Sequence, residues 1–345
     1  MKRVFSPDIS NKNSFDFLRV LFAFSVFISH FKELTAASIY NWPISASMGV
    51  VGFFVISGFL ITRSYDRSPN LYNYISKRIR RIVPAYVFIV LSCAILFSFV
   101  SSLSFQEYFT SNVFYKYLAA NLSFLNFIQP TLPGVFSNNP LPFVNGSLWT
   151  IKMELGMYAI VPIIMLILKR KPLLFFIGLY IFSFLIICYP ANFDNGSWYA
   201  PIIMFVQSFS HLACYFISGM ILLFYFDFFK KQIKWVLPSS MIVFISKYFI
   251  SYGVINFFYP LSFAILIVSF AYYFKRLSFV SKYGDISYGM YLFHYPLIQL
   301  LTHCECLKEK PILLFFTCLC ILVPLSWLSW HLLEKRLLKR DNRPQ

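Results

Sequence analysis

Long apolar stretches separated by short polar segments recur along the whole chain. A helix needs about 20 apolar residues to cross the hydrocarbon core of a bilayer, and ten stretches approach or exceed that length. They cover residues 14–33, 46–65, 82–103, 147–168, 173–190, 201–226, 236–252, 257–274, 286–303 and 312–330. Lys247 interrupts the seventh, which makes it the weakest of the ten as a candidate span. The pattern predicts an all-α polytopic integral membrane protein with about ten transmembrane helices.

The composition supports this class. Of the 345 residues, 59% are hydrophobic and 21% aromatic, whereas only 12% are charged. A soluble domain of this size has no use for so much apolar surface, and aromatic residues suit the lipid-facing surface and its interfaces. The formal net charge of +17 is interpreted as orientation signals and contacts with anionic lipid headgroups, so no nucleic-acid partner is expected.

Basic residues gather in every second connecting segment, and most lysines and arginines lie on one predicted side of the bilayer. These segments begin at Lys2, Arg63, Lys169, Lys230, Lys275 and Lys335. The positive-inside rule then places both termini in the cytoplasm. Arg19 interrupts the apolar core that a cleavable signal peptide needs, so the first run is expected to remain as an anchor.

A single transmembrane domain over residues 1–345 is expected, with no appended soluble domain. Its longest outer segment, about 104–146, is rich in Pro, Asn and Gly. It is too short for a separate folded domain and is expected to form an outer loop that covers a site. A short tract, His303 to Cys306, resembles a metal or redox site, but it is isolated in a predicted loop and no bound metal is expected.

Arg19 and His30 lie eleven residues apart in the first run. Helical geometry places their side chains within roughly 20° on one face and about 16 Å apart along the axis, with Arg19 toward the inner side. His30 is the leading candidate for a general base, because a neutral imidazole can accept a proton from a hydroxyl. Arg19 is a candidate to hold an anionic group. The structural alternatives are an interfacial histidine and an ion pair with Asp16.

Two further segments suggest binding or packing. The second run opens as GVVGFFVISGFLI, and its Ser57-Gly58 step either opens the helix or allows close helix packing. At the predicted cytoplasmic boundary, the sequence KRIRRIVP brings Arg78, Arg80 and Arg81 together. This cluster predicts a dock for phosphate groups, and its structural alternative is an orientation anchor.

The fourth run carries Glu154 at a depth that roughly matches that of His30. A carboxylate there can orient an imidazole and stabilise its cationic form. The alternative is a salt link with Lys152, which is disfavoured because residues two apart do not face each other on a helix. The ninth run carries Tyr291 and His294 at membrane depth, where a histidine is usually functional rather than incidental.

Five motifs in order make the chain resemble the membrane acyltransferase-3 family, the group of polysaccharide and O-antigen O-acetylases. They are the Arg-x10-His first run, the GxxxFFVxSGFLI-like second run, RIRRIVPAY, SLWTIKMELGMY and ISYGMYLFHYP. The sequence departs from the family at two points. Glu154 is followed by Leu155 instead of a second glutamate, and Glu334 is followed by Lys335 instead of Arg-Pro. The first departure affects any two-carboxylate role, and the second is expected to affect stability only.

The resemblance implies an acyltransferase that moves an acyl group, usually acetyl, from cytosolic acyl-CoA to a hydroxyl of a cell-surface glycan such as O-antigen. It implies His30 as the base, with Glu154 and Arg19 also catalytic. Arg78, Arg80 and Arg81 are expected near the donor, together with Ser57, Gly58, Tyr291 and His294. No permanently bound cofactor is implied. The expected location is the bacterial inner membrane.

A different class stays open on the sequence alone. A non-enzymatic transporter or flippase of lipid-linked sugars also uses Arg, Glu and His inside the membrane. Inverted repeats or paired broken helices would favour it, and neither is evident. The sequence does not specify the acceptor sugar, the hydroxyl position, the acyl chain, the group that stabilises the oxyanion or the oligomeric state.

Overall fold

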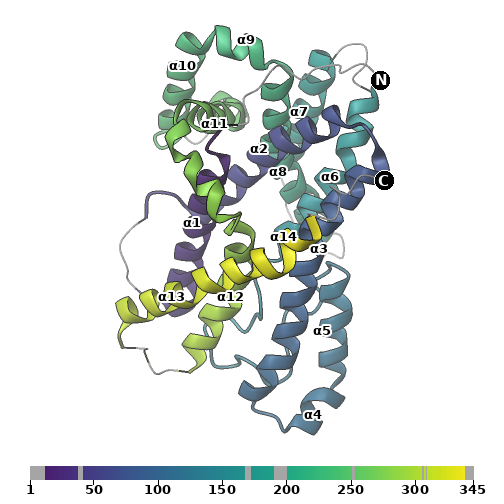
Figure 1. The fold of residues 1–345 in the computed structure, drawn as a ribbon, viewed down its shortest axis with the longest axis vertical. Coiled ribbons are helices and arrows are strands. Elements are labelled where there is room, and N and C mark those ends of the chain that lie inside the picture. Colours follow the sequence, from purple (N-terminus) through teal and green to yellow (C-terminus); the bar gives the residue numbers. More distant parts are fainter. Residues whose placement is uncertain are drawn as a thin grey trace. The chain divides into compact units, whose positions relative to one another are not determined.

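The protein is described from a computed structural model, which covers residues 12–37, 42–167, 172–189, 200–250, 253–304, 307 and 309–338. Within these ranges the chain is helical and contains no strand. The longer helices are α1 (Phe15–Thr35), α2 (Ala46–Arg67), α3 (Leu71–Leu96), α6 (Trp149–Ile167), α7 (Pro172–Cys188), α8 (Ala200–Phe224), α10 (Ile233–Ser246), α11 (Val254–Tyr273), α12 (Ser287–His303) and α13 (Pro311–Ser329) (Figure 1). The shorter ones are η1 (Phe97–Val100), α4 (Phe105–Thr110), α5 (Asn112–Leu122), α9 (Phe226–Lys231), η2 (Lys275–Tyr283), the π-helical turn η3 (Trp330–Glu334) and α14 (Lys335–Leu338).

Each of the ten apolar runs coincides with one of the longer helices. Among the described residues, six helical segments are long and apolar enough to cross a membrane, and α7 and α10 are shorter apolar helices. The all-helical, multi-span class is therefore confirmed, while the number ten stays a prediction. The orientation also stays a prediction, because Lys2 and the basic loop at Lys169 lie outside the described residues.

The chain divides into two compact units. The first comprises Met1–Leu18, Val50–Tyr74 and Met153–Ser278. It contains most of α2 and α6 together with α7 to α11, and α8 packs against both α7 and α11. The Tyr180 hydroxyl on α7 donates a hydrogen bond to the Phe257 carbonyl on α11, 2.5 Å away. This unit is thus a helical bundle whose elements follow one another closely along the chain.

Glycines allow α2 and α8 to approach each other within this unit. A Cβ added to Gly58 would lie 2.0 Å from the Phe216 carbonyl oxygen, and one added to Gly219 would lie 2.3 Å from the Val55 carbonyl oxygen. Two backbones meet at this crossing, so no side chain can move aside to make room. Of the two roles that the sequence allowed for the Ser57-Gly58 step, the structure shows the packing role for Gly58.

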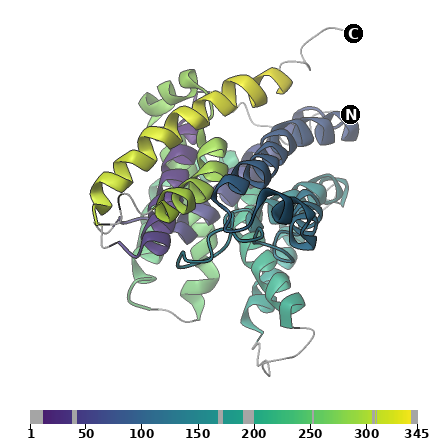
Figure 2. The ribbon, with the colours of Figure 1, turned by 90° about the horizontal axis from the view of Figure 1, so that it is seen from below.

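The second unit comprises Arg19–Gly49, Ile75–Lys152 and Phe279–Gln345. It contains most of α1 and α3, the short helices α4 and α5, and α12 to α14. Helices α12 and α13 lie side by side in both views (Figures 1 and 2). They approach closely at Gly289, where an added Cβ would lie 2.8 Å from the Cα atom of Ser326. The Phe27 ring of α1 packs on Phe315 of α13, with centroids 5.3 Å apart.

The segment predicted as an outer loop, about 104–146, contains the helices α4 and α5 and then an irregular stretch. A capping box formed by Ser104 and Glu107 starts α4. The hydrogen bonds from the Ser104 hydroxyl and backbone N–H lower the pKa of the exposed Glu107 carboxyl. Further along, the fully buried Gln299 side chain of α12 donates to the carbonyls of Leu141 and Phe143, at 2.5 and 2.6 Å. The irregular stretch is therefore fastened directly to α12.

The crossing of α2 and α8 yields a packing prediction. Replacing Gly58 by alanine should lower the free energy of unfolding by about 2 kcal/mol or more, because the added methyl meets a backbone carbonyl that cannot move aside. Gly178→Ala on α7 is the matched control, since nothing lies within 4 Å of an added Cβ there. Thermal unfolding in detergent measures both variants. Equal midpoints for the two would contradict the packing role of Gly58.

Candidate active site

Two imidazoles meet in the second unit, one from α1 and one from α12. The Nδ1 atom of His30 lies 2.8 Å from the Nε2 atom of His294. The two ring planes are nearly parallel, at 7°, and the ring centroids are 5.1 Å apart. His294 is fully buried, with an exposed fraction of 0%, whereas His30 is half-buried. We refer to His30 and His294 as the histidine pair.

The partners of the pair determine which nitrogen carries each proton. The Nδ1 atom of His294 lies 3.0 Å from the Met290 carbonyl oxygen, one helical turn earlier. A carbonyl only accepts hydrogen bonds, so Nδ1 of neutral His294 carries the proton and its Nε2 is an acceptor. His30 must then donate from Nδ1 to that Nε2. The Nε2 atom of His30 is left with the lone pair of a base, and the hydrogen bond at Nδ1 persists when the ring becomes cationic.

The rest of the local wall comes from α12 and the end of the outer segment. The Tyr295 ring packs edge-on against His30 with centroids 5.2 Å apart. Gly146 lies against Tyr295, because an added Cβ would come within 2.7 Å of that ring. The Tyr291 hydroxyl donates to the Ser147 carbonyl at 3.0 Å and lies 2.6 Å from the Thr150 hydroxyl. The role predicted for Tyr291 near the donor stays a prediction.

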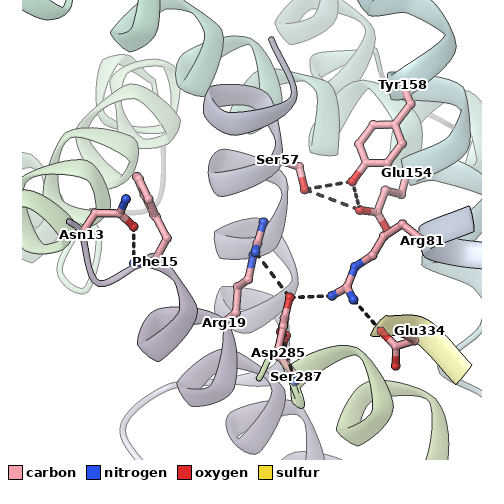
Figure 3. Close-up of polar contacts among 10 residues, drawn as sticks. All are labelled: Asn13, Phe15, Arg19, Ser57, Arg81, Glu154, Tyr158, Asp285, Ser287 and Glu334. Carbon is pink, nitrogen blue, oxygen red and sulfur yellow. Dashed lines mark hydrogen bonds and ion pairs between the residues drawn. The ribbon is translucent and has the colours of Figure 1, made fainter. Parts of the chain in front are cut away.

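Arg19 belongs to a chain of alternating charges, which we call the charge network and which consists of Arg19, Asp285, Arg81 and Glu334 (Figure 3). Asp285 Oδ2 accepts from Arg19 at 3.4 Å and from Arg81 at 2.5 Å. The other arm of the Arg81 guanidinium lies 2.5 Å from Glu334 Oε2. Two cations thus meet two carboxylates, and the arrangement brings α1, α3, the turn before α12 and the π-helical turn η3 together.

Arg81 is enclosed by aromatic rings as well as by carboxylates. Its guanidinium carbon lies 5.1 Å from the Trp330 ring centroid and 5.6 Å from that of Tyr288. Glu334 has an exposed fraction of 0%. Burial raises the pKa of the Asp285 carboxyl, but Arg81, Arg19 and the hydrogen bonds from Ser287 together lower it further. The net shift is downward, so Asp285 is ionised at neutral pH.

In the first unit, Ser57 of α2 meets Glu154 and Tyr158 of α6. The Tyr158 hydroxyl donates to the Glu154 carboxylate. The Ser57 hydroxyl lies 3.5 Å from the same carboxylate oxygen and 3.4 Å from the Tyr158 hydroxyl (Figure 3). The predicted roles of Glu154 in orienting His30 and of Ser57 near the donor stay predictions.

Arg78, Arg80 and Arg81 all lie in the first half of α3, which begins at Leu71, and are half-buried. Although they are close in sequence, their surroundings differ. Among the described residues, no group of three His, Cys, Asp or Glu side chains is arranged to hold a metal ion. The tract His303 to Cys306 is only partly covered, because Glu305 and Cys306 lie outside the described residues.

Sequence reasoning missed Asp285 and Glu334 as partners of the two arginines. A usable signal existed, because an arginine inside an apolar run requires a carboxylate, and Asp285 directly precedes the ninth run. The pairing of Arg19 with Asp16, one helical turn away, stays a prediction. The contact between His294 and His30 was also missed, because spacing within one helix carries no information about contacts between helices.

The chain is similar to known proteins over most of its length. The family model described as an acyltransferase domain matches residues 12–331. An "O-acetyl transferase" of Shigella phage Sf6 is 26% identical over 345 residues, which cover 96% of this chain and 97% of that protein. "Nodulation protein 10" of Rhizobium leguminosarum bv. viciae is 34% identical over 176 residues, or 46% of each chain. "O-acetyltransferase OatA" of Staphylococcus aureus (strain NCTC 8325 / PS 47) is 24% identical over 343 residues, or 87% of this chain and 54% of OatA. No solved structure matches the chain.

The charge network yields a stability prediction. Arg81→Gln should lower the free energy of unfolding by about 3 kcal/mol, because it leaves the buried Glu334 carboxylate without its cation. Adding Glu334→Gln to Arg81→Gln should restore much of the loss, since two amides can hydrogen-bond without a buried charge. Thermal unfolding in detergent measures the effect, with the exposed Arg276→Gln as control. A double variant as unstable as the sum of its single variants would refute the coupling.

Proposed function

The chain belongs to the acyltransferase-3 family and is an O-acetyltransferase, and we propose that it transfers acetyl from cytosolic acetyl-CoA to a hydroxyl of a cell-surface polysaccharide such as O-antigen. The observation that carries this proposal is the histidine pair, which leaves Nε2 of His30 as a proton acceptor. The proposed location is the bacterial inner membrane, with the basic ends of the helices in the cytoplasm.

The chemistry assigned to His30 is that of a general base. Its Nε2 takes the proton of the acceptor hydroxyl as the oxygen attacks the thioester carbonyl. The tetrahedral intermediate then collapses to the new ester and releases the CoA thiolate, which recovers the proton from His30. During the step His30 becomes an imidazolium, and its Nδ1–H remains hydrogen-bonded to Nε2 of His294. Proton and charge therefore return to their starting positions after each transfer.

The assignment of His294 follows from the same geometry. His294 holds His30 in the tautomer with a bare Nε2, and its bond to the Met290 carbonyl fixes its own proton at Nδ1. We therefore place His294 in a positioning role and not among the donor-binding groups. The carboxylate of Glu154 stays a candidate for a second orienting or stabilising group.

The donor phosphates are assigned to Arg78, Arg80 and Arg81, in the first half of α3. Arg81 is also bound by Asp285 and Glu334, so a phosphate at Arg81 competes with both carboxylates. Arg78 and Arg80 lie beside it on α3, at the end that the charge pattern assigns to the cytoplasm, where acyl-CoA is found. Arg19 is proposed to support the site through its ion pair with Asp285.

The base assignment is tested by comparing three histidine variants in membranes of a host strain that lacks the gene. His30→Ala should lower transfer of labelled acetyl from acetyl-CoA to the polysaccharide fraction by about 10²- to 10⁴-fold. His294→Ala should lower it by about 10- to 100-fold, because a hydrogen bond to a charged ring is lost. His294→Gln, whose amide oxygen can accept the same hydrogen, should retain more activity.

His303→Gln, at the end of the same helix α12, is the matched control and should transfer at the wild-type rate. Undiminished transfer by His30→Ala would remove His30 from the mechanism. A wild-type protein that transfers no acetyl while glycan is still exported would instead favour a transporter.

The donor assignment is tested with sealed vesicles of defined sidedness. Because acetyl-CoA does not cross membranes, wild-type protein should transfer label only in inside-out vesicles. Arg78→Ala and Arg80→Ala should each raise the KM for acetyl-CoA about tenfold, the cost of one charge-assisted hydrogen bond, with little change in thermal midpoint. The control Arg276→Ala should leave KM unchanged. Equal transfer in right-side-out vesicles would contradict a cytosolic donor.

A further inference from the structure

Asp285 uses its two carboxylate oxygens for different partners. Oδ1 accepts hydrogen bonds from the Ser287 hydroxyl and from the Ser287 backbone N–H, the latter at 3.3 Å. These bonds anchor the first turn of α12, whose N–H groups have no partners within the helix. Oδ2 accepts from Arg19 of α1 and Arg81 of α3. One carboxylate thus ties the beginning of α12 to two other helices.

The same two helices, α1 and α12, meet a second time at the histidine pair. The first contact joins Arg19 to Asp285, and the second joins His30 to His294. The two helices therefore run in the same direction between the contacts. Eleven residues of α1 correspond to about 16 Å and nine residues of the α12 segment to about 13 Å, a difference that the long Arg19 side chain can absorb.

This double contact makes the hydrogen bond between the two histidines sensitive to helix register. A shift of one residue moves a helix by about 1.5 Å along its axis, enough to break a hydrogen bond of normal length. The His294 imidazole cannot follow such a shift, because its Nδ1 atom is bound to the Met290 carbonyl of its own helix. A fixed point elsewhere on both helices is therefore needed, and Asp285 occupies that point.

We propose that Asp285 is a positioning residue, which sets the register of α1 and α12 through Arg19 and Arg81 so that His30 and His294 stay hydrogen-bonded. The proposal rests on the proposed function of His30 as the base. Tyr288 supports the same arrangement, since its hydroxyl donates to the Ile82 carbonyl of α3 at 2.9 Å. No role for Asp285 is predicted from the sequence alone.

The variant Asp285→Asn separates the two tasks of the side chain. The amide oxygen of asparagine can still accept from Ser287, but the amide nitrogen cannot accept from either guanidinium. We expect kcat to fall about tenfold, the cost of a misplaced charge-assisted hydrogen bond, with the KM for acetyl-CoA unchanged. Asp285→Glu keeps a carboxylate within reach of both arginines and should recover part of the rate. The exposed Asp227→Asn is the control.

A double-mutant cycle distinguishes positioning from a general loss of structure. If Asp285 acts through the histidine pair, Asp285→Asn should cost little further activity in a protein that already carries His294→Ala. Kinetics in inside-out vesicles, normalised to the amount of folded protein, measure all four members of the cycle. If the fold-losses in kcat of the two single variants multiply in the double variant, the proposal is overturned. A wild-type kcat for Asp285→Asn would overturn it as well.

Two further outcomes separate the positioning role of Asp285 from the proposed role of His30 as the base. An inactive His30→Ala combined with a fully active Asp285→Asn leaves the base in place and rejects the positioning role. A fully active His30→Ala rejects the base, and with it the reason for positioning. Where Asp285→Asn yields no folded protein, Arg19→Gln removes one arm of the same contact, and its loss of kcat must likewise vanish in the His294→Ala background.

Discussion

The cost of placing arginine among apolar helices governs the arrangement of the second unit. A guanidinium cannot lose its charge, so it must reach a carboxylate or water. Arg19 and Arg81 share Asp285, and Arg81 also reaches the buried Glu334. Because these four groups come from segments far apart in the chain, satisfying their charges also fixes where α1, α3, α12 and the C-terminal π-helical turn meet.

The histidine pair depends on that meeting point, and its hydrogen bond has a defined donor and a defined acceptor. Two neutral imidazoles can share only one hydrogen, so the contact is always asymmetric, with one donor and one acceptor. The Met290 carbonyl determines which ring is the donor, because it accepts the hydrogen on Nδ1 of His294 and leaves Nε2 of His294 as an acceptor. A backbone group of α12 thereby decides that His30 presents its Nε2 lone pair, which links the helical backbone to the chemistry proposed for the site.

The sequence predicted what lies within single helices better than what lies between them. The eleven-residue spacing of Arg19 and His30 placed both on one face of a helix, and both contact the α12 segment, at Asp285 and His294. The ten apolar runs likewise coincide with helices. In contrast, Asp285 and Glu334 are single carboxylates at the ends of apolar runs, and nothing local connects them to arginines two hundred residues or more away. Only the fold supplies those pairings.

The stretch around Arg78, Arg80 and Arg81 shows that side chains of one charge on one helix can have different surroundings. All three lie in the first half of α3, and the sequence predicted one role for them. Successive residues on a helix point about 100° apart, and this rotation brings Arg81 to Asp285 and Glu334. A carboxylate already bound to a guanidinium lowers its affinity for a phosphate by direct competition. A basic cluster in a membrane enzyme therefore has to be divided by helix face before its members are assigned to a substrate.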